Sequence, residues 1–166
     1  MSNFDWSRFV TRININAPIE QLYRLWATRN GMEYWFLRMS EYKTADGVLR
    51  ANDEPAEKGD TYCWRWYGWG DEITEYGTIL EANGTDYFKF TFGEGCDCSV
   101  FIKEELGYHI IELVQENIPT NENGKHSWHL GCKTGWTFYL SNMKSLVEGG
   151  VDLRNKDEQL KRMINA

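Results

Sequence analysis

The chain has 166 residues and a formal net charge of −7, from 25 acidic and 18 basic side chains. A domain of this length buries about 70% of the surface of its unfolded chain, so its core needs neither disulfides nor a metal. Nucleic acids and anionic membranes attract basic patches, and the sequence contains no cluster of Lys and Arg. These features argue against a nucleic-acid partner.

Leader and membrane signals are absent from the sequence. The N-terminus has no basic and apolar leader pattern, and no apolar run approaches the ~20 residues that span a bilayer. The cysteines (Cys63, Cys96, Cys98 and Cys132) lack the paired spacing of a zinc site, so we expect free thiols and no metal or cofactor. We therefore predict a cytoplasmic protein. With neither linker nor repeat, residues 1–166 are interpreted as a single domain.

The first elements predicted are a strand and two helices. Residues 9–16 alternate apolar and polar side chains, which is typical of a strand. Pro18 suits the start of a helix, because proline lacks only an N–H that would have no partner there. The inward face of this helix carries Ile19, Leu22, Tyr23 and Trp26. Thr28 is placed to cap a second, short helix over residues 32–37.

Residues 44–119 are predicted to be nearly all strand. In residues 60–67 the alternation puts Tyr62, Trp64 and Trp66 on one face. Asn83-Gly84 is a strong hairpin signal, because both residues tolerate a positive φ, and Leu106-Gly107 marks another hairpin. Hairpins in series form an antiparallel meander, so we expect five to seven antiparallel strands between residues 9 and 119.

A long helix of about five turns is predicted for residues 128–148. Its apolar stripe is Trp128, Cys132, Trp136, Tyr139, Met143 and Leu146. Lys133 and Lys144 lie on the opposite, exposed side, and Gly149-Gly150 provides a left-handed end. We expect residues 120–127 to be a polar loop. The charged tail, residues 151–166, is compatible with a short terminal helix.

The order of these elements resembles the START-like (SRPBCC) or birch-pollen-allergen superfamily, whose fold is called the helix grip. Local motifs are similar to the branch of homologues of the activator of the ninety-kilodalton heat-shock chaperone's ATPase. These motifs are Ala17-Pro18-x-Glu20-x-Leu22-Tyr23-x-Leu25-Trp26, Trp35-Phe36, Gly59-Asp60-x-Tyr62-x-Trp64-x-Trp66 and Gly131-x-x-x-Gly135-Trp136-x-x-x-Leu140. The resemblance implies an α+β domain whose curved antiparallel sheet wraps around the long C-terminal helix, with an internal cavity. It carries no shared catalytic motif.

The candidate ligand-binding residues lie on the predicted inner faces of the sheet and the long helix. They are Tyr62, Trp64, Trp66, Phe90, Gly135, Trp136 and Tyr139. A glycine inside a helix costs roughly 1 kcal/mol relative to Ala, so Gly131 and Gly135 either leave room for a ligand or allow close backbone packing. The candidate polar groups are Arg65, Glu75, His109, Gln115, Glu116 and His129. A structural hydrogen bond is the alternative reading for His129.

These features support three hypotheses, in order of preference. The first is a protein that binds a hydrophobic or aromatic small molecule or a lipid in an internal cavity of roughly 300 Å³ or more. The second is a chaperone-associated protein that acts through its surface. The third is a cyclase or dehydratase, in which polar side chains move protons inside an apolar cavity. A homodimer is compatible with all three.

Overall fold

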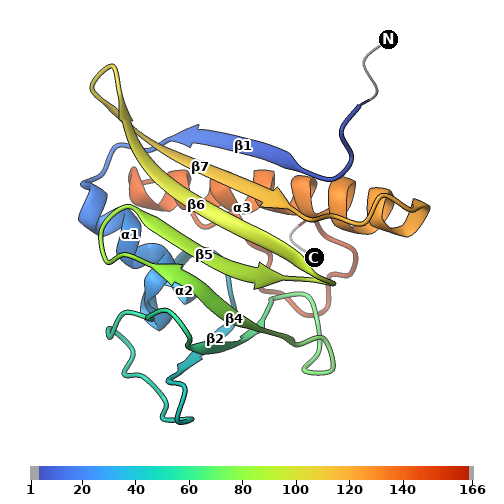
Figure 1. The fold of residues 1–166 in the computed structure, drawn as a ribbon, viewed down its shortest axis with the longest axis horizontal. Helices are drawn as coiled ribbons and strands as arrows, with labels where there is room; N and C mark the ends of the chain where they lie inside the picture. The colour runs from blue at the N-terminus through green and yellow to red at the C-terminus, as the bar shows by residue number, and fades with distance from the viewer. Residues whose placement is uncertain (1–3, 165–166) are drawn as a thin grey trace.

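The computed structural model describes residues 4–164 as one curved antiparallel sheet with helices on its concave side (Figure 1). The strands are β1 (Phe9–Asn14), β2 (Met39–Lys43), β3 (Thr61–Arg65), β4 (Glu75–Ala82), β5 (Tyr87–Phe92), β6 (Cys96–Glu105) and β7 (Tyr108–Glu116). Their order in the sheet is β1-β7-β6-β5-β4-β3-β2, which confirms the expected antiparallel meander. This α+β architecture is compatible with a helix grip.

The helices pack where the sequence places them, with one extension. They are α1 (Ile19–Ala27), α2 (Arg29–Trp35) and α3 (Cys132–Val147), and α3 is preceded by a π-helical segment, η1 (Gly124–Gly131). Thr28 caps α2, because its hydroxyl oxygen accepts a hydrogen bond from the Gly31 amide at 3.0 Å. Gly149, with φ of 85°, follows the end of α3 as a left-handed residue.

Four local predictions are wrong. Residues 44–60 form a connection with no named strand, while β2 (Met39–Lys43) precedes it. The helical conformation begins within residues 120–127, which were predicted to be a loop, because η1 starts at Gly124. The tail contains no helix within residues 151–164. Lys144 is half-buried rather than exposed, because its ammonium group donates to the Asn14 carbonyl oxygen at 2.6 Å.

A buried ion cluster orders the connection between β2 and β3. The Arg50 side chain is 8% exposed and pairs with Asp60, whose side chain is 4% exposed. The Arg50 guanidinium also donates to the Glu54 carboxylate at 2.7 Å. A charge this buried needs such partners, and they anchor an otherwise largely exposed connection at Arg50 and Asp60.

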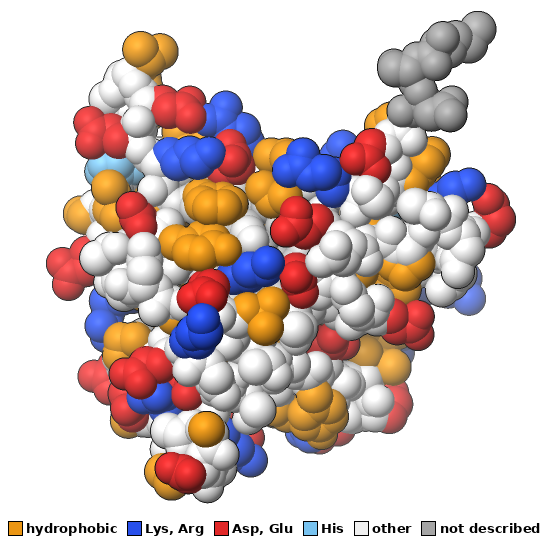
Figure 2. All heavy atoms as spheres, in the orientation of Figure 1, with side chains coloured by type: hydrophobic (Ala, Val, Ile, Leu, Met, Phe, Trp, Pro, Cys, Tyr) orange, Lys and Arg blue, Asp and Glu red, His pale blue; other side chains and the backbone are white. Residues whose placement is uncertain are grey.

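The two faces of the sheet differ in chemistry. The concave face contacts α3 and carries the aromatic core, including Trp64 and Phe90, both fully buried. On the face turned away from α3, acidic and basic side chains lie among apolar ones (Figure 2). Ion pairs link neighbouring strands on that face, such as Lys103–Glu112 at 2.6 Å. The concave side therefore carries the apolar surface on which a ligand site could form.

Candidate functional site

A pocket of about 180 Å³ lies between α3 and the β3–β5 end of the sheet. Its helical wall comes from η1 and the first turns of α3, where Gly131, Cys132 and Gly135 line the space. The remaining surface is largely aromatic, provided by Phe36, Trp66, Trp69, Phe92, Trp136 and Tyr139. Among the described residues that line it, none is an Asp, Glu, Lys, Arg or His. The pocket is smaller than the cavity expected from the sequence.

The helix glycines face this open space. A Cβ atom added to Gly135 would meet no atom within 4 Å, and one added to Gly131 would meet only the His126 carbonyl oxygen, at 3.5 Å. Gly124 behaves differently, because a Cβ there would overlap the Pro119 carbonyl group. Close packing therefore accounts for Gly124 but not for Gly131 or Gly135. The geometry favours the first of the two readings, in which these glycines leave room.

Four of the seven candidate residues border the pocket: Trp66, Gly135, Trp136 and Tyr139. Trp136 is 2% exposed, and its indole N–H donates to the Gln115 side-chain oxygen at 3.0 Å. Phe36 joins these rings, with its centroid 5.0 Å from Trp136 and 4.8 Å from Tyr139. The contacts hold the aromatic wall in a defined arrangement.

The other three candidates, Tyr62, Trp64 and Phe90, lie in the filled core beside the pocket. Tyr62 stacks on Trp64 with ring centroids 3.7 Å apart, and Phe90 meets Trp64 edge-on at 5.2 Å. The Tyr62 ring covers Gly77 on β4, where any Cβ would overlap it. Large rings thus occupy this space themselves. Burial also raises the pKa of the Tyr62 phenol.

Three aromatic wall residues, Phe36, Trp69 and Phe92, were absent from the candidate set. Phe36 follows α2 and belongs to the Trp35-Phe36 motif, while Trp69 lies between Gly68 and Gly70 in the connection from β3 to β4. Phe92 follows Phe90 at the spacing of one strand face, so alternation carried a signal for it. Which of two such rings meets open space depends on the elements packed above them.

The polar candidates lie away from the pocket wall. Gln115 is fully buried and accepts hydrogen bonds from Trp136 and, at 3.4 Å, from the Cys98 thiol. Glu75 accepts from the Gly93 amide at 2.8 Å, and burial raises its pKa. Arg65 pairs with Asp71 at 3.0 Å, and Glu116 lies 3.8 Å from Lys89.

Both histidine candidates have structural hydrogen bonds. His129 is 1% exposed, with its Nδ1 3.0 Å from the Trp6 carbonyl oxygen and its ring edge-on to Phe9. His109 places its Nδ1 2.6 Å from the Ala17 carbonyl oxygen. The structural reading of His129 is therefore confirmed.

The thiols are free in the structure. Cys96 and Cys98 are buried, whereas Cys63 and Cys132 are partly accessible. Burial raises the pKa of Cys132, on the pocket wall, to about 11. Within residues 4–164, no group of three or more His, Cys, Asp or Glu side chains is arranged to hold a metal ion. No helix over the same residues is long and apolar enough to cross a membrane.

Comparison with known proteins defines the class of fold. No family model and no curated protein matches the sequence. The chain is similar in structure to protein SSP2350 from Staphylococcus saprophyticus, with a TM-score of 0.67 and 19% identity over 89% of this chain and 96% of that one. It is also similar to the Aha1 dimer from Colwellia psychrerythraea, with a TM-score of 0.65 and 15% identity over 86% and 97% of the two chains.

A third similar structure is DynU16, a putative protein in the dynemicin biosynthetic locus. Its TM-score is 0.67 and its identity 14%, over 90% of this chain and 50% of DynU16. Identities this low show a shared fold and leave the function to be argued from the pocket. The protein is thus an α+β protein of the fold shared by Aha1 and these neighbours.

Proposed function

We propose that the protein is a START-like, helix-grip domain that binds a small, uncharged aromatic or hydrophobic molecule in the pocket between α3 and the sheet. The open space over Gly135 carries this proposal. A helix glycine there costs about 1 kcal/mol relative to Ala, yet no atom lies within 4 Å of the Cβ position to require it. Room for a ligand accounts for the glycine.

The size of the pocket limits the ligand. Its volume of about 180 Å³ lies below the range of roughly 300–1,000 Å³ typical of sites for drug-sized molecules. It exceeds the roughly 150 Å³ of an apolar cavity that accepts benzene. We infer that the ligand contains one aromatic ring or two fused rings. A charged group on it would lose its hydration without finding a partner among the described lining residues.

Binding is favoured over catalysis by the groups on the wall. Burial is the main cause of the raised pKa values of the Cys132 thiol and the Tyr139 phenol. Both are therefore protonated at neutral pH, and neither acts as a proton-abstracting base there. The cyclase or dehydratase hypothesis gains no support from this wall. A chaperone partner and a homodimer remain predictions that rest on the resemblance.

The proposal is tested by titrating the protein with naphthalene and following tryptophan emission. We expect saturable binding, because the ring stacks beside Trp66, Trp69 or Trp136. Gly135→Leu fills the space and should reduce the affinity at least tenfold. Thr134→Leu, on the exposed side of the same helix, is the matched control and should bind like the wild type. Absence of binding to the wild type, or equal binding by Gly135→Leu, would refute the proposal.

A further inference from the structure

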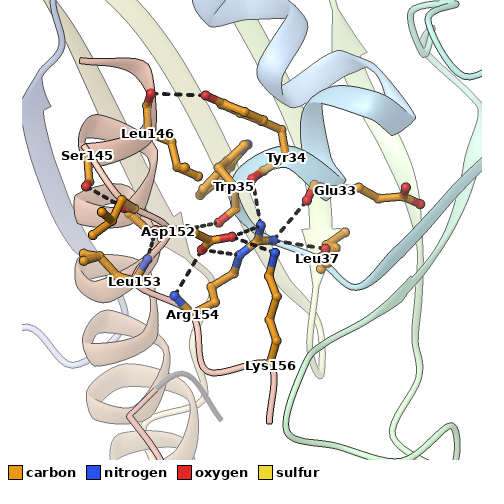
Figure 3. A network of polar contacts seen from close by, with 12 residues as sticks. Glu33, Tyr34, Trp35, Leu37, Ser145, Leu146, Asp152, Leu153, Arg154 and Lys156 are labelled. Carbon is orange, nitrogen blue, oxygen red and sulfur yellow. Dashed lines mark hydrogen bonds and ion pairs between the residues drawn. The ribbon is translucent and has the colours of Figure 1, made fainter. Parts of the chain in front are cut away.

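The C-terminal segment after α3, residues 149–156, is a strap that lies against α2 and α3 (Figure 3). The Ser145 hydroxyl donates to the Val151 carbonyl oxygen at 2.7 Å. The buried Asn142 side chain joins three elements: it accepts from the Leu153 amide and donates to the Trp35 carbonyl oxygen, each at 2.7 Å. The strap is therefore tied to α3 and to the end of α2 at once.

Arg154 is the most buried charge of the strap, with a side chain that is 2% exposed. Its guanidinium donates to the carbonyl oxygens of Glu33 at 3.0 Å, Tyr34 at 2.8 Å and Leu37 at 3.1 Å. Asp152 balances its charge through two hydrogen bonds of 2.9 and 2.8 Å (Figure 3).

These carbonyls belong to the last turn of α2 and the residues after it. Such groups have no partner within the helix, and the negative end of the helix dipole favours a cation there. Phe36, a wall of the pocket, lies between Tyr34 and Leu37 in the sequence. By binding the backbone on both sides of Phe36, Arg154 fixes where that ring stands.

Arg154 also contacts the connection between β3 and β4. Its guanidinium carbon lies 5.4 Å from the centroid of the Tyr67 ring, and the Lys156 ammonium lies 5.2 Å from it. Cation–π contacts at this distance are attractive. Tyr67 directly follows Trp66 and precedes Trp69, two pocket-lining rings of the β3–β4 connection. One side chain thus contacts the backbone on both sides of Phe36 and the connection that carries Trp66 and Trp69.

We propose that Arg154 is a positioning residue for the pocket and that the strap acts as a latch that holds Phe36 on one side and the Trp66–Trp69 connection on the other. The inference deepens the proposed function, because it identifies what holds two walls of that same pocket in place. Release of Arg154 frees both walls together without removing any lining side chain.

The test uses the full-length protein with Arg154→Gln. Hydrogen–deuterium exchange should rise at least about tenfold at residues 36–38 and 66–70, while β6 and β7 stay protected. A merely stabilising residue would raise exchange throughout the protein. Arg24→Gln is the matched control, because Arg24 also donates to a backbone carbonyl, that of Asp53 at 2.7 Å, away from the pocket.

A second readout is the release of naphthalene in stopped-flow fluorescence, which Arg154→Gln should speed up about tenfold. Arg154→Lys retains the charge but not the planar fork, so its effect should be intermediate. If Arg154→Gln fails to fold, Tyr67→Leu severs only the contact with the β3–β4 connection and should raise exchange at residues 66–70. Unchanged exchange at both segments in the folded variants would overturn the latch. If the wild type binds no naphthalene but exchange rises as expected, only the proposed function fails.

Discussion

Gly124 in η1 and Gly135 in α3 provide a test of the pocket, because alanine at the two positions should change the free energy of unfolding in opposite directions. Gly135 faces open space, whereas a Cβ at Gly124 would overlap the Pro119 carbonyl group. Gly135→Ala should therefore stabilise the protein and Gly124→Ala should destabilise it. The comparison isolates the space around each position, because both substitutions add the same methyl group to a helical residue.

The magnitudes follow from the surroundings of each glycine. Gly135→Ala removes the helix penalty of glycine without any clash, so the free energy of unfolding should rise by about 1 kcal/mol. For a chain of this size, that raises the Tm by about 2–4 °C. Gly124→Ala must displace backbone and should cost about 1–3 kcal/mol, the usual range for overpacking. Gly135→Leu should stabilise as well, since each added methylene that it buries contributes about 0.8 kcal/mol.

Urea unfolding followed by far-ultraviolet circular dichroism measures these changes. The free energy of unfolding should fall with urea concentration at the same slope in all variants, so that the urea midpoint of unfolding reports stability alone. A loss of stability in Gly135→Ala would mean that the space above Gly135 is filled in solution. The pocket would then have to be abandoned, whereas a gain of stability in Gly124→Ala would contradict only the close packing at Gly124.

Two further predictions concern side chains that meet at the pocket. Trp136→Ala should lower the free energy of unfolding by about 3–5 kcal/mol, because the ring is 2% exposed and its removal leaves a cavity and deprives Gln115 of a hydrogen-bond donor. A decrease below about 1 kcal/mol in urea unfolding would show that the ring is not packed. Burial raises the pKa of the Cys132 thiol from about 9 in the unfolded chain to about 11 in the folded chain. At pH values between these two, the unfolded chain has lost a proton that the folded chain keeps. Stability should therefore fall between pH 9 and 11, and less steeply in Cys132→Ala; equal slopes for the two proteins would contradict the burial of this thiol.

Much of the fold could be predicted from the sequence because it depends on short-range signals. Asn83-Gly84 closes a hairpin by itself: the Asn83 side chain accepts from the amides of residues 85–87, and Gly84 takes a φ of 78°. Period-two alternation placed Tyr62 and Trp64 on one strand face, and both are buried in the structure. The helical stripe likewise placed Trp136 against the sheet. These patterns act within a few residues, so no distant partner is needed to interpret them.

The pocket wall and the strap were decided only by the tertiary structure. Phe90 and Phe92 have the same strand periodicity, yet one is buried under Trp64 and the other borders open space, because the elements above them differ. In the sequence, Arg154 belongs to a charged tail and gives no sign of being buried. It is buried because its guanidinium donates to backbone carbonyl groups at the end of α2, about 120 residues earlier in the chain. Local sequence determines which face of an element is apolar. Whether that face meets a ring, a guanidinium or an empty volume depends on segments that come together only when the whole chain has folded.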